Sequence, residues 1–171
     1  MKSYGTKILG VERIELGPWM DARGAFVEAL SASFEFHVCQ VNLAKNTKAG
    51  TVRGMHWQGA PAAQTKLVYA ASGIFMDVAV DVRRDSPTYG EVVSLKLFPL
   101  ENALYIPPGV AHGCQALEDG ATLMYLLDAK YSPTHERGFR VDDPVLERVW
   151  PLLPSNVAAR DLSWPLMKDV S

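Results

Sequence analysis

Short apolar segments with a two-residue period run through most of the chain. In residues 77–82, valines alternate with aspartate or alanine, which is the pattern of a half-buried strand. Residues 92–97 alternate in a similar way, and residues 122–127 form a continuous apolar strand candidate. Turn residues separate these segments, as at 72–73, 85–87, 107–109 and 119–120. Many short strands at a spacing of about 8–12 residues predict an antiparallel sandwich or barrel rather than an α/β fold.

The sequence pattern changes near residue 130. The β pattern covers about residues 7–127, and no long amphipathic helix pattern interrupts it. Beyond it, prolines punctuate the chain, and residues 145–150 are long enough for only a turn or two of helix. We therefore expect a single domain over residues 1–171, with a short irregular or helical C-terminal extension over about 130–171 that packs on the β core.

Composition and charge exclude several classes of protein. The chain has 171 residues, with 17 Lys+Arg against 19 Asp+Glu and a formal net charge of −2. This balance gives no electrostatic footprint for nucleic acid or for an anionic membrane. Two cysteines make neither a disulfide framework nor a zinc site, and they suit a reducing compartment. No stretch reaches the 18 or so apolar residues of a membrane span, so we expect a cytoplasmic protein.

Two histidines stand near turns in the apolar β region. The segment Arg53–Gln58 reads as a strand with Arg53 and Met55 on one face and Gly54, His56 and Gln58 on the other. A second histidine, His112, follows the tight turn Pro107-Pro108-Gly109, and Lys66 begins another apolar strand. A single histidine is usually a structural imidazole with satisfied hydrogen bonds. Two histidines and a lysine together indicate a polar pocket.

The segment at 107–112 resembles the second cupin motif, Pro-x-Gly-x-x-His, and so predicts an all-β fold, a cupin-type antiparallel β-barrel or jelly roll. The first metal-binding cupin motif requires His-x-His followed shortly by Glu. Here the register is His56-Trp57-Gln58, and residues 60–63 are Ala-Pro-Ala-Ala. Two histidines and a neutral amide are too few ligands for a stable divalent site. We therefore expect no metal and no other cofactor.

Several further motifs identify a family. They are the RGAF segment at 23–26, RGMHWQ at 53–58, KLV at 66–68, the run 75–90 that ends in Ser-Pro-Thr-Tyr-Gly, IPPGVAHG at 106–113 and Tyr-Ser-Pro at 131–133. In this order and spacing they resemble the dTDP-4-dehydrorhamnose 3,5-epimerases, cupin enzymes of deoxysugar biosynthesis. The resemblance covers about residues 8–166. It implies a substrate that is a nucleotide-diphospho 4-keto-6-deoxysugar, whose carbons 3 and 5 flank the ketone and therefore carry acidic hydrogens.

The resemblance also implies catalytic roles. It assigns the base to His56, a carboxylate that orients this imidazole to Asp161, and the acid on the opposite face of the sugar to Tyr131. Lys66 matches the residue that stabilises the oxyanion at the 4-keto oxygen, and His112 matches a second pocket histidine near that oxygen. From the residues alone, Asp161 reads equally well as a solvated carboxylate of the tail, and Tyr131 as an aromatic at the pocket rim.

Substrate-binding residues follow from the same resemblance. Arg23 and Glu28 match positions that hold the nucleotide from a neighbouring subunit, which implies a homodimer with swapped N-terminal strands. Arg53 matches a diphosphate contact, for which a guanidinium fork is suited. Gln40 and Asn42 fit a Gln-x-Asn segment of the family. The chain departs from the family pattern at six positions, which are Ala44, Asn46, Thr65, Tyr69, Cys114 and Gln115.

Four alternatives remain open. A mono-epimerase would use the same catalytic pair to invert only carbon 3 or only carbon 5. A ketoisomerase of the cupin fold need not retain His56 and Tyr131. A non-catalytic cupin could bind a sugar nucleotide, although binding alone does not require a base and an acid on opposite faces. A metal-dependent cupin oxygenase would contain a metal ion.

Overall fold

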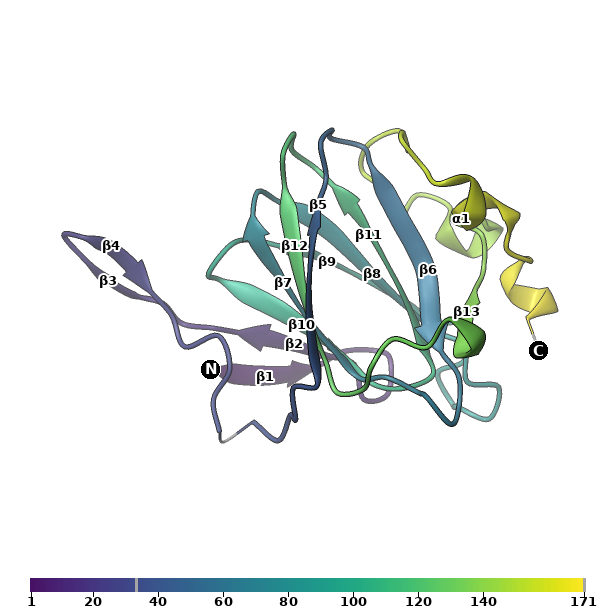
Figure 1. The fold of residues 1–171 in the computed structure, drawn as a ribbon, viewed down its shortest axis with the longest axis horizontal. Coiled ribbons are helices and arrows are strands. Elements are labelled where there is room, and N and C mark those ends of the chain that lie inside the picture. The colour runs from purple at the N-terminus through teal and green to yellow at the C-terminus, as the bar shows by residue number, and fades with distance from the viewer. Residues whose placement is uncertain (33, 171) are drawn as a thin grey trace.

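Two antiparallel sheets face each other in the computed structural model, which describes residues 1–32 and 34–170 (Figure 1). The six-stranded sheet has the order β1-β2-β10-β7-β12-β5. Its strands are β1 (Lys2–Gly5), β2 (Glu12–Glu15), β5 (Gln40–Lys45), β7 (Lys66–Ser72), β10 (Asn102–Ile106) and β12 (Thr122–Leu127). The five-stranded sheet has the order β13-β6-β11-β8-β9. Its strands are β6 (Val52–Gln58), β8 (Phe75–Asp81), β9 (Val92–Leu97), β11 (Val110–Ala116) and β13 (Glu136–Gly138).

This arrangement confirms the all-β, jelly-roll fold with a short helical C-terminal extension. The strands expected over 92–97 and 122–127 are β9 and β12. The β pattern of residues 7–127 is accompanied by β1 before it and by β13 after it. The extension holds the helix α1 (Ala159–Ser163) and three short 3₁₀ helices, at Pro133–His135, Pro144–Leu146 and Met167–Asp169. None of the helices in residues 1–32 and 34–170 is long and apolar enough to cross a membrane.

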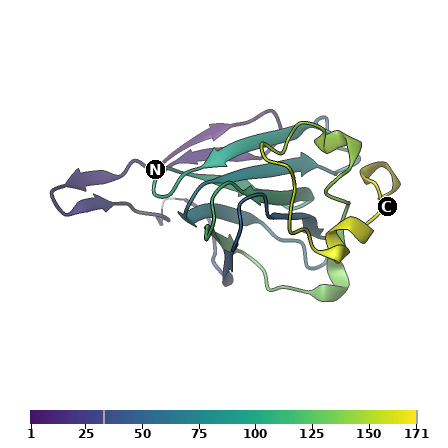
Figure 2. The ribbon, with the colours of Figure 1, turned by 90° about the horizontal axis from the view of Figure 1, so that it is seen from above.

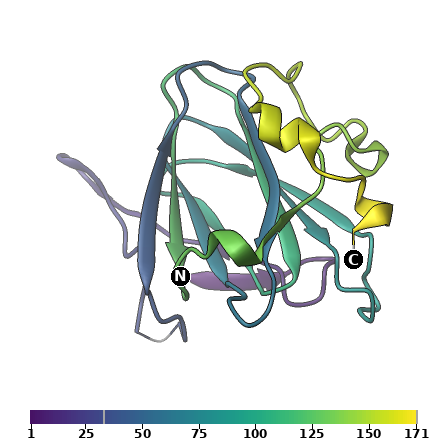
Figure 3. The same cartoon turned by 45° about the vertical axis from the view of Figure 1, so that its right-hand side comes forward.

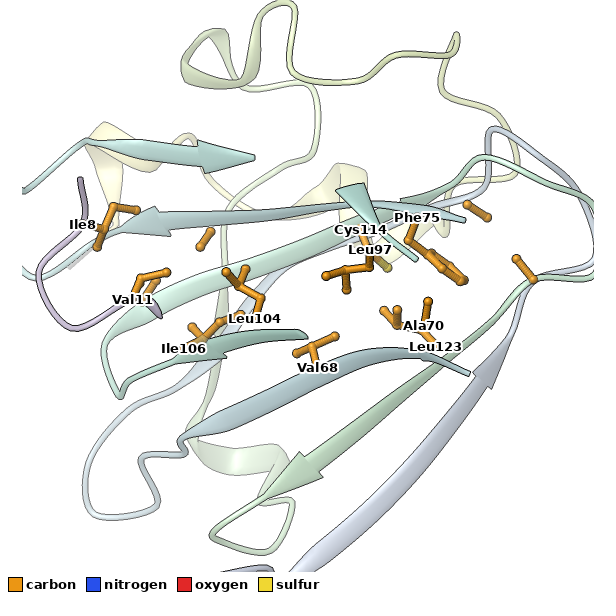
Figure 4. Packing of buried hydrophobic residues seen from close by; sticks show 14 residues of the cluster. Ile8, Val11, Val68, Ala70, Phe75, Leu97, Leu104, Ile106, Cys114 and Leu123 are labelled. Atoms are coloured by element: carbon orange, nitrogen blue, oxygen red, sulfur yellow. The ribbon is translucent and has the colours of Figure 1, made fainter. Parts of the chain in front are cut away.

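The space between the sheets is an apolar core over much of its length (Figure 4). Phe75, Leu104 and Leu123 are among its fully buried side chains. They come from strands of both sheets, because alternate residues of each strand point inward. Burial of such side chains from water is the main force that holds the two sheets together. The core also includes Cys114, whose side chain lies beside the pocket described below.

The C-terminal extension covers the outer face of the five-stranded sheet, on the side of β6 (Figure 3). Val78 and Val80 of β8 pack there in a second cluster with Phe139, Leu146 and Met167 of the extension. The prediction that residues 77–82 form a half-buried strand is therefore wrong, since most of β8 is buried on both faces. The extension supplies the second apolar layer, which the local alternation of residues could not reveal.

Residues of the N-terminal segment cover the outer face of the six-stranded sheet. Val27, Leu30, Phe34 and Phe36 pack against the buried Leu67 and its neighbours on that face. The short hairpin β3–β4 (Trp19–Asp21 and Gly24–Phe26) pairs with neither large sheet. It projects from the barrel, on the side away from the C-terminal extension (Figures 1 and 2).

Candidate active site

A pocket of about 430 Å³ opens between the two sheets. Its walls come from β5, β7 and β12 on one side, from β6 and β11 on the other, and from the C-terminal extension. Seven of the ten residues that the sequence predicts for the site line it: Asn42, Arg53, His56, Lys66, His112, Tyr131 and Asp161. These residues are as much as 119 positions apart in the chain (Asn42 to Asp161), so the fold alone brings them together.

His56 and Asp161 form a dyad in this pocket. The ring nitrogen Nε2 of His56 lies 2.8 Å from Oδ1 of Asp161, and the second carboxylate oxygen accepts the backbone N–H of Gly54 at 3.2 Å. The Asp161 side chain is only 6% exposed. Burial raises its pKa, but its hydrogen bonds with His56 and with the Gly54 N–H outweigh burial and hold the pKa below its ordinary value. Asp161 is therefore a buried carboxylate that orients an imidazole, not a solvated residue of the tail.

A β-bulge places Arg53 and His56 on the same face of β6. In the pairing with β11, His56 stands opposite His112, but Arg53 stands opposite Cys114, so three steps along β6 match two along β11. The predicted separation of Arg53 and His56 onto opposite faces is therefore wrong, because the bulge reverses the alternation between them. Gly54 makes the bulge feasible: its φ is +130°, and a Cβ there would lie 2.5 Å from Cα of Gly113.

A second histidine–carboxylate pair lies deeper in the pocket. Nε2 of His112 is 2.8 Å from Oδ1 of Asp77, and both side chains are almost fully buried. The other oxygen of Asp77 has no hydrogen-bond partner among the described residues. The Lys66 ammonium lies nearby and donates to the backbone oxygen of His56 at 3.0 Å. Burial lowers the pKa of Lys66 to about 8, although the negative charges of Asp77 and Glu136 partly oppose this effect.

Tyr131 also lines the pocket and is 48% exposed. Its phenol donates a hydrogen bond to Oε2 of Glu136, and Oε1 of the same carboxylate forms an ion pair with Arg160. Glu136 and Arg160 both line the pocket, and neither was predicted from the sequence. The signal that could have found them is position: Glu136 follows the Tyr-Ser-Pro motif closely, and Arg160 directly precedes Asp161.

The predicted substrate-binding residues of the barrel fall into two groups. Arg53 reaches into the pocket and is held by Asn46, whose Oδ1 accepts from its Nε at 2.8 Å. Gln40 does not line the pocket. Its amide donates to Oδ1 of Asn42 at 2.9 Å and accepts the backbone N–H of Tyr131 at 2.9 Å. Gln40 therefore connects β5 to the loop that carries Tyr131.

Arg23 and Glu28 do not line the pocket of their own chain. The Arg23 side chain is 90% exposed and pairs with Asp21 on the projecting hairpin (Figure 1). Glu28 lies just beyond the hairpin and is also exposed. The structure of one chain thus leaves both residues apart from the other predicted site residues.

The departures from the family pattern differ in position. Ala44 and Cys114 line the pocket, whereas the Tyr69 phenol donates to the Ala29 backbone oxygen on the outer face of the six-stranded sheet. Sγ of Cys114 lies 3.8 Å from the phenol oxygen of Tyr125, which is another pocket residue that sequence reasoning missed. Burial raises the pKa of the Cys114 thiol to about 12, so this side chain is a small neutral group of the pocket wall.

In residues 1–32 and 34–170, no group of three or more His, Cys, Asp or Glu side chains is arranged to hold a metal ion. The pocket instead presents a histidine–aspartate dyad, a tyrosine, a lysine and a second histidine. On a cupin-type barrel, this set of acid–base groups defines an isomerase that moves protons on its substrate.

Comparisons with known proteins agree with this class. The dTDP-4-dehydrorhamnose 3,5-epimerase family matches residues 5–169. The dTDP-4-dehydrorhamnose 3,5-epimerase of Sinorhizobium fredii is 40% identical over 153 residues, which cover 85% of this chain and 78% of the relative. The chain belongs to the dTDP-4-dehydrorhamnose 3,5-epimerase family.

Two solved structures extend the comparison. One is a 4-keto-6-deoxy sugar epimerase from the novobiocin biosynthetic gene cluster of Streptomyces spheroides, with 32% identity and a TM-score of 0.93 over 99% of this chain and 88% of that one. The other is a 3′-monoepimerase from Streptomyces bikiniensis in complex with dTDP-quinovose, with 32% identity and a TM-score of 0.88 over 94% of this chain and 85% of that one.

Proposed function

We propose that the protein inverts carbon 3, carbon 5 or both in a nucleotide-diphospho 4-keto-6-deoxysugar such as dTDP-4-dehydro-6-deoxyglucose, in deoxysugar biosynthesis. The observation that carries this proposal is the His56–Asp161 dyad at 2.8 Å in a pocket that Tyr131 also lines. The 4-keto group acidifies the hydrogens on carbons 3 and 5, so a base can form an enolate. Removal of a proton on one face and its return on the other inverts the carbon.

His56 is the base in this mechanism. Histidine titrates near neutral pH and is the side chain best suited to general-base catalysis there. The buried Asp161 carboxylate fixes the orientation of the ring and stabilises the imidazolium that forms. The carbon–hydrogen bond breaks, the proton moves to His56, and the electron pair delocalises onto the 4-keto oxygen.

Lys66 and His112 stabilise the negative charge on that oxygen. Both line the pocket, and the Lys66 ammonium is fixed by its bond to the His56 backbone oxygen. Preorganised donors of this kind are most effective where water is excluded. Tyr131 is the acid: its O–H bond breaks as the new carbon–hydrogen bond forms on the opposite face, and the enolate electron pair forms that bond.

The nucleotide diphosphate lies toward Arg53 and Asn42. The planar guanidinium of Arg53 suits two phosphate oxygens at once, and its bond to Asn46 holds it at the pocket wall. Gln40 supports this end of the site through its hydrogen bonds to Asn42 and to the Tyr131 backbone. Arg53→Ala is expected to raise KM much more than it lowers kcat, because the phosphates do not react.

The functional unit is a homodimer in which the N-terminal hairpin of one subunit completes the nucleotide site of its neighbour. A free two-stranded hairpin is only marginally stable, and this one exposes Trp19 by 62% and Phe26 by 70%. The edge strand β5 exposes Val41 by 53% and Leu43 by 67%, on the face opposite to Asn42 and Ala44, which line the pocket. Apolar groups on an unpaired strand edge suit a strand from a second copy. Arg23 and Glu28 would then reach the neighbour's substrate.

Mixing two defective variants tests this assembly. His56→Ala removes the base, and Arg23→Glu removes the contact given to the neighbour. In a mixed dimer, the Arg23→Glu subunit keeps its own His56 and receives an intact Arg23 from the His56→Ala subunit. We expect activity to return on mixing after subunit exchange. A protein that sediments as a monomer and turns over normally would contradict the dimer.

We also assign the protein to the cytoplasm. Both cysteines, Cys39 and Cys114, are free, which suits a reducing compartment. Cell fractionation with an antibody against the protein tests this assignment.

The deciding experiment for the function follows deuterium entry from heavy water into dTDP-4-dehydro-6-deoxyglucose by NMR. Exchange and inversion at carbons 3 and 5 are expected of a 3,5-epimerase, and at carbon 3 alone of a 3-epimerase. The similarity to the Streptomyces bikiniensis 3′-monoepimerase makes the second outcome a specific alternative. Tight binding of the nucleotide sugar without exchange at either carbon would identify a non-catalytic binding cupin and overturn the proposal.

A further inference from the structure

The backbone on both sides of Tyr131 is fixed to the barrel. Its own N–H donates to Oε1 of Gln40 at 2.9 Å. Gln58 holds the flanking residues: its Nε2 donates to the Lys130 backbone oxygen at 3.2 Å, and its Oε1 accepts the Ser132 N–H at 2.6 Å. The remaining freedom of Tyr131 is therefore the rotation of its side chain, which is 48% exposed at the pocket wall.

Glu136 restrains that rotation. One carboxylate oxygen accepts the Tyr131 phenol proton and the other pairs with Arg160, so the two neighbours bind opposite ends of one carboxylate. The Glu136 side chain is 13% exposed, whereas that of Arg160 is 49% exposed. The guanidinium of Arg160 also lies 5.4 Å from the centroid of the Trp164 ring, a cation–π contact. Arg160 is thus held by two groups and in turn fixes the Glu136 carboxylate.

The same short helix, α1, supports both halves of the catalytic machinery. Asp161 of α1 binds the His56 ring, and the adjacent Arg160 reaches Tyr131 through Glu136. The Trp164 ring, at the end of α1, lies 6.2 Å from the His56 ring, so Trp164 contacts both His56 and Arg160. A displacement of α1 would therefore move the partner of the base and the partner of the acid together.

We propose that Glu136 and Arg160 are positioning residues that hold the Tyr131 phenol, in its protonated form, at the distance from His56 that net inversion requires. This inference rests on the proposed function, in which Tyr131 is the acid. Glu136 keeps the phenol oriented and protonated, and Arg160 offsets the negative charge that the phenolate and the carboxylate share after the proton has left. Water then returns a proton to the exposed phenolate.

Charge and protonation agree with this role. The hydrogen bond to the Glu136 carboxylate raises the pKa of Tyr131, since the phenolate would face a second negative charge. The charged groups around the phenol are Glu136 of β13 and Arg160 of α1, and Lys66 of β7 acts on Glu136 from across the pocket. Removal of the carboxylate therefore lowers the pKa of the phenol.

The ratio of net inversion to solvent exchange tests the proposal. Enolate formation by His56 precedes both processes, so the titration of Lys66 affects both and cancels in the ratio. Glu136→Ala should lower this ratio by about tenfold to a hundredfold, as small misplacements of reacting groups do. The change should be absent in the Tyr131→Phe background, because residues that act as a unit are not additive. A ratio that stays at the parent value overturns the proposal.

If Glu136→Ala lowers the inversion-to-exchange ratio by the same factor in the Tyr131→Phe background, the proposal is also overturned. Glu136 would then act on the sugar without Tyr131. Glu136→Gln is the second variant, because it keeps the shape of the side chain and keeps the test available if Glu136→Ala fails to fold. In a plot of the inversion-to-exchange ratio against pH, Glu136→Gln should shift the decline at high pH to lower pH. A decline at the same pH as in the parent contradicts the role of the carboxylate. Arg160→Lys should retain more of the ratio than Arg160→Gln, and equal losses would remove Arg160 from the proposal.

Asp142→Ala is the matched control, since Asp142 pairs with Arg140 on the surface of the same extension. It should leave the ratio unchanged, and a change of equal size would show that any lost ion pair in the extension has this effect, which overturns the proposal. A parent enzyme without exchange and inversion refutes the proposed function, whereas a normal parent with a normal Glu136→Ala ratio refutes only the positioning role.

Discussion

Asp161 lies 2.8 Å from the His56 ring nitrogen although 105 positions of sequence separate the two residues. The carboxylate comes from the C-terminal helix α1 and the imidazole from β6, so the dyad exists only when the extension is docked on the barrel. The extension therefore completes the proposed catalytic pair in addition to covering an apolar face of the sheet.

Asp161→Asn tests the orienting role of this carboxylate. The amide fits the same space but removes the negative charge that stabilises the imidazolium and selects the ring tautomer. We expect kcat to fall on the order of 10²–10⁴-fold with little change in KM, by analogy with the loss of the orienting carboxylate in catalytic triads. Steady-state kinetics measure both constants. An amide variant with the parent kcat would show that Asp161 only supports the fold.

His56→Ala tests the base itself. No other side chain is assigned to remove a proton, so solvent exchange at every substrate carbon should fall by about 10²–10⁴-fold or more. NMR of the nucleotide sugar in heavy water measures this exchange. His37→Ala is the matched control, because His37 is an exposed histidine outside the pocket. Exchange that persists near the parent rate in His56→Ala would place the base elsewhere.

Lys66 gives the activity a defined pH dependence. Burial lowers the pKa of its ammonium to about 8, and only the charged form stabilises an enolate oxygen. The charged fraction is full well below pH 8 and is lost as the pH rises through that value. Exchange should therefore decline on the alkaline side with a midpoint near pH 8. Lys66→Met, which is uncharged at every pH, should be slower than the parent below pH 8 and should lack this alkaline decline. If Lys66→Met retains the alkaline decline in exchange, another group causes that decline.

The shifted pKa of Lys66 also makes the stability of the fold depend on pH. The pKa of Lys66 is lower in the folded protein than in the unfolded chain, so the unfolded chain binds more protons between the two values. The contribution of Lys66 to the free energy of unfolding therefore increases with pH across that interval, from about pH 8 upward.

Gly54 is the residue on which the bulge of β6 depends. Gly54→Ala should lower the free energy of unfolding by about 1–3 kcal/mol, since the positive φ disfavours any side chain, and the added Cβ would lie 2.5 Å from Cα of Gly113. Gly24→Ala is the control: Gly24 has a φ of +125°, but a Cβ there meets nothing within 4 Å. Urea unfolding should show a larger loss for Gly54→Ala. Equal losses would mean that the close approach to Gly113 costs nothing.

The sequence predicted the fold class and the members of the pocket better than it predicted their local geometry. The family motifs identified His56, Lys66, His112, Tyr131 and Asp161, which the pocket brings together. These motifs carry chemistry in residue types that are otherwise rare in an apolar β core, so they are visible in one chain.

Local patterns failed where a distant segment changes the environment. The alternation in residues 77–82 indicated an exposed face, but the extension buries it. The alternation in residues 53–58 put Arg53 opposite His56, but a single bulge reverses it. Glu136 and Arg160 were not predicted, because their pairing spans 24 positions and depends on the docked extension. No pattern of period two or 3.6 contains such information.

Tyr131→Phe separates the two halves of the proposed reaction. The substitution removes the phenol proton and keeps the ring, which is 48% exposed and can stay in place, so substrate binding should change little. His56 can still form the enolate and return a proton to the same face. The variant should therefore retain substantial deuterium exchange while net inversion falls by about 10²–10⁴-fold, the range for loss of a general acid. NMR of the product mixture measures both quantities in one sample. If Tyr131→Phe inverts the sugar as fast as the parent, then solvent or another donor protonates the far face, and Tyr131 is not the acid.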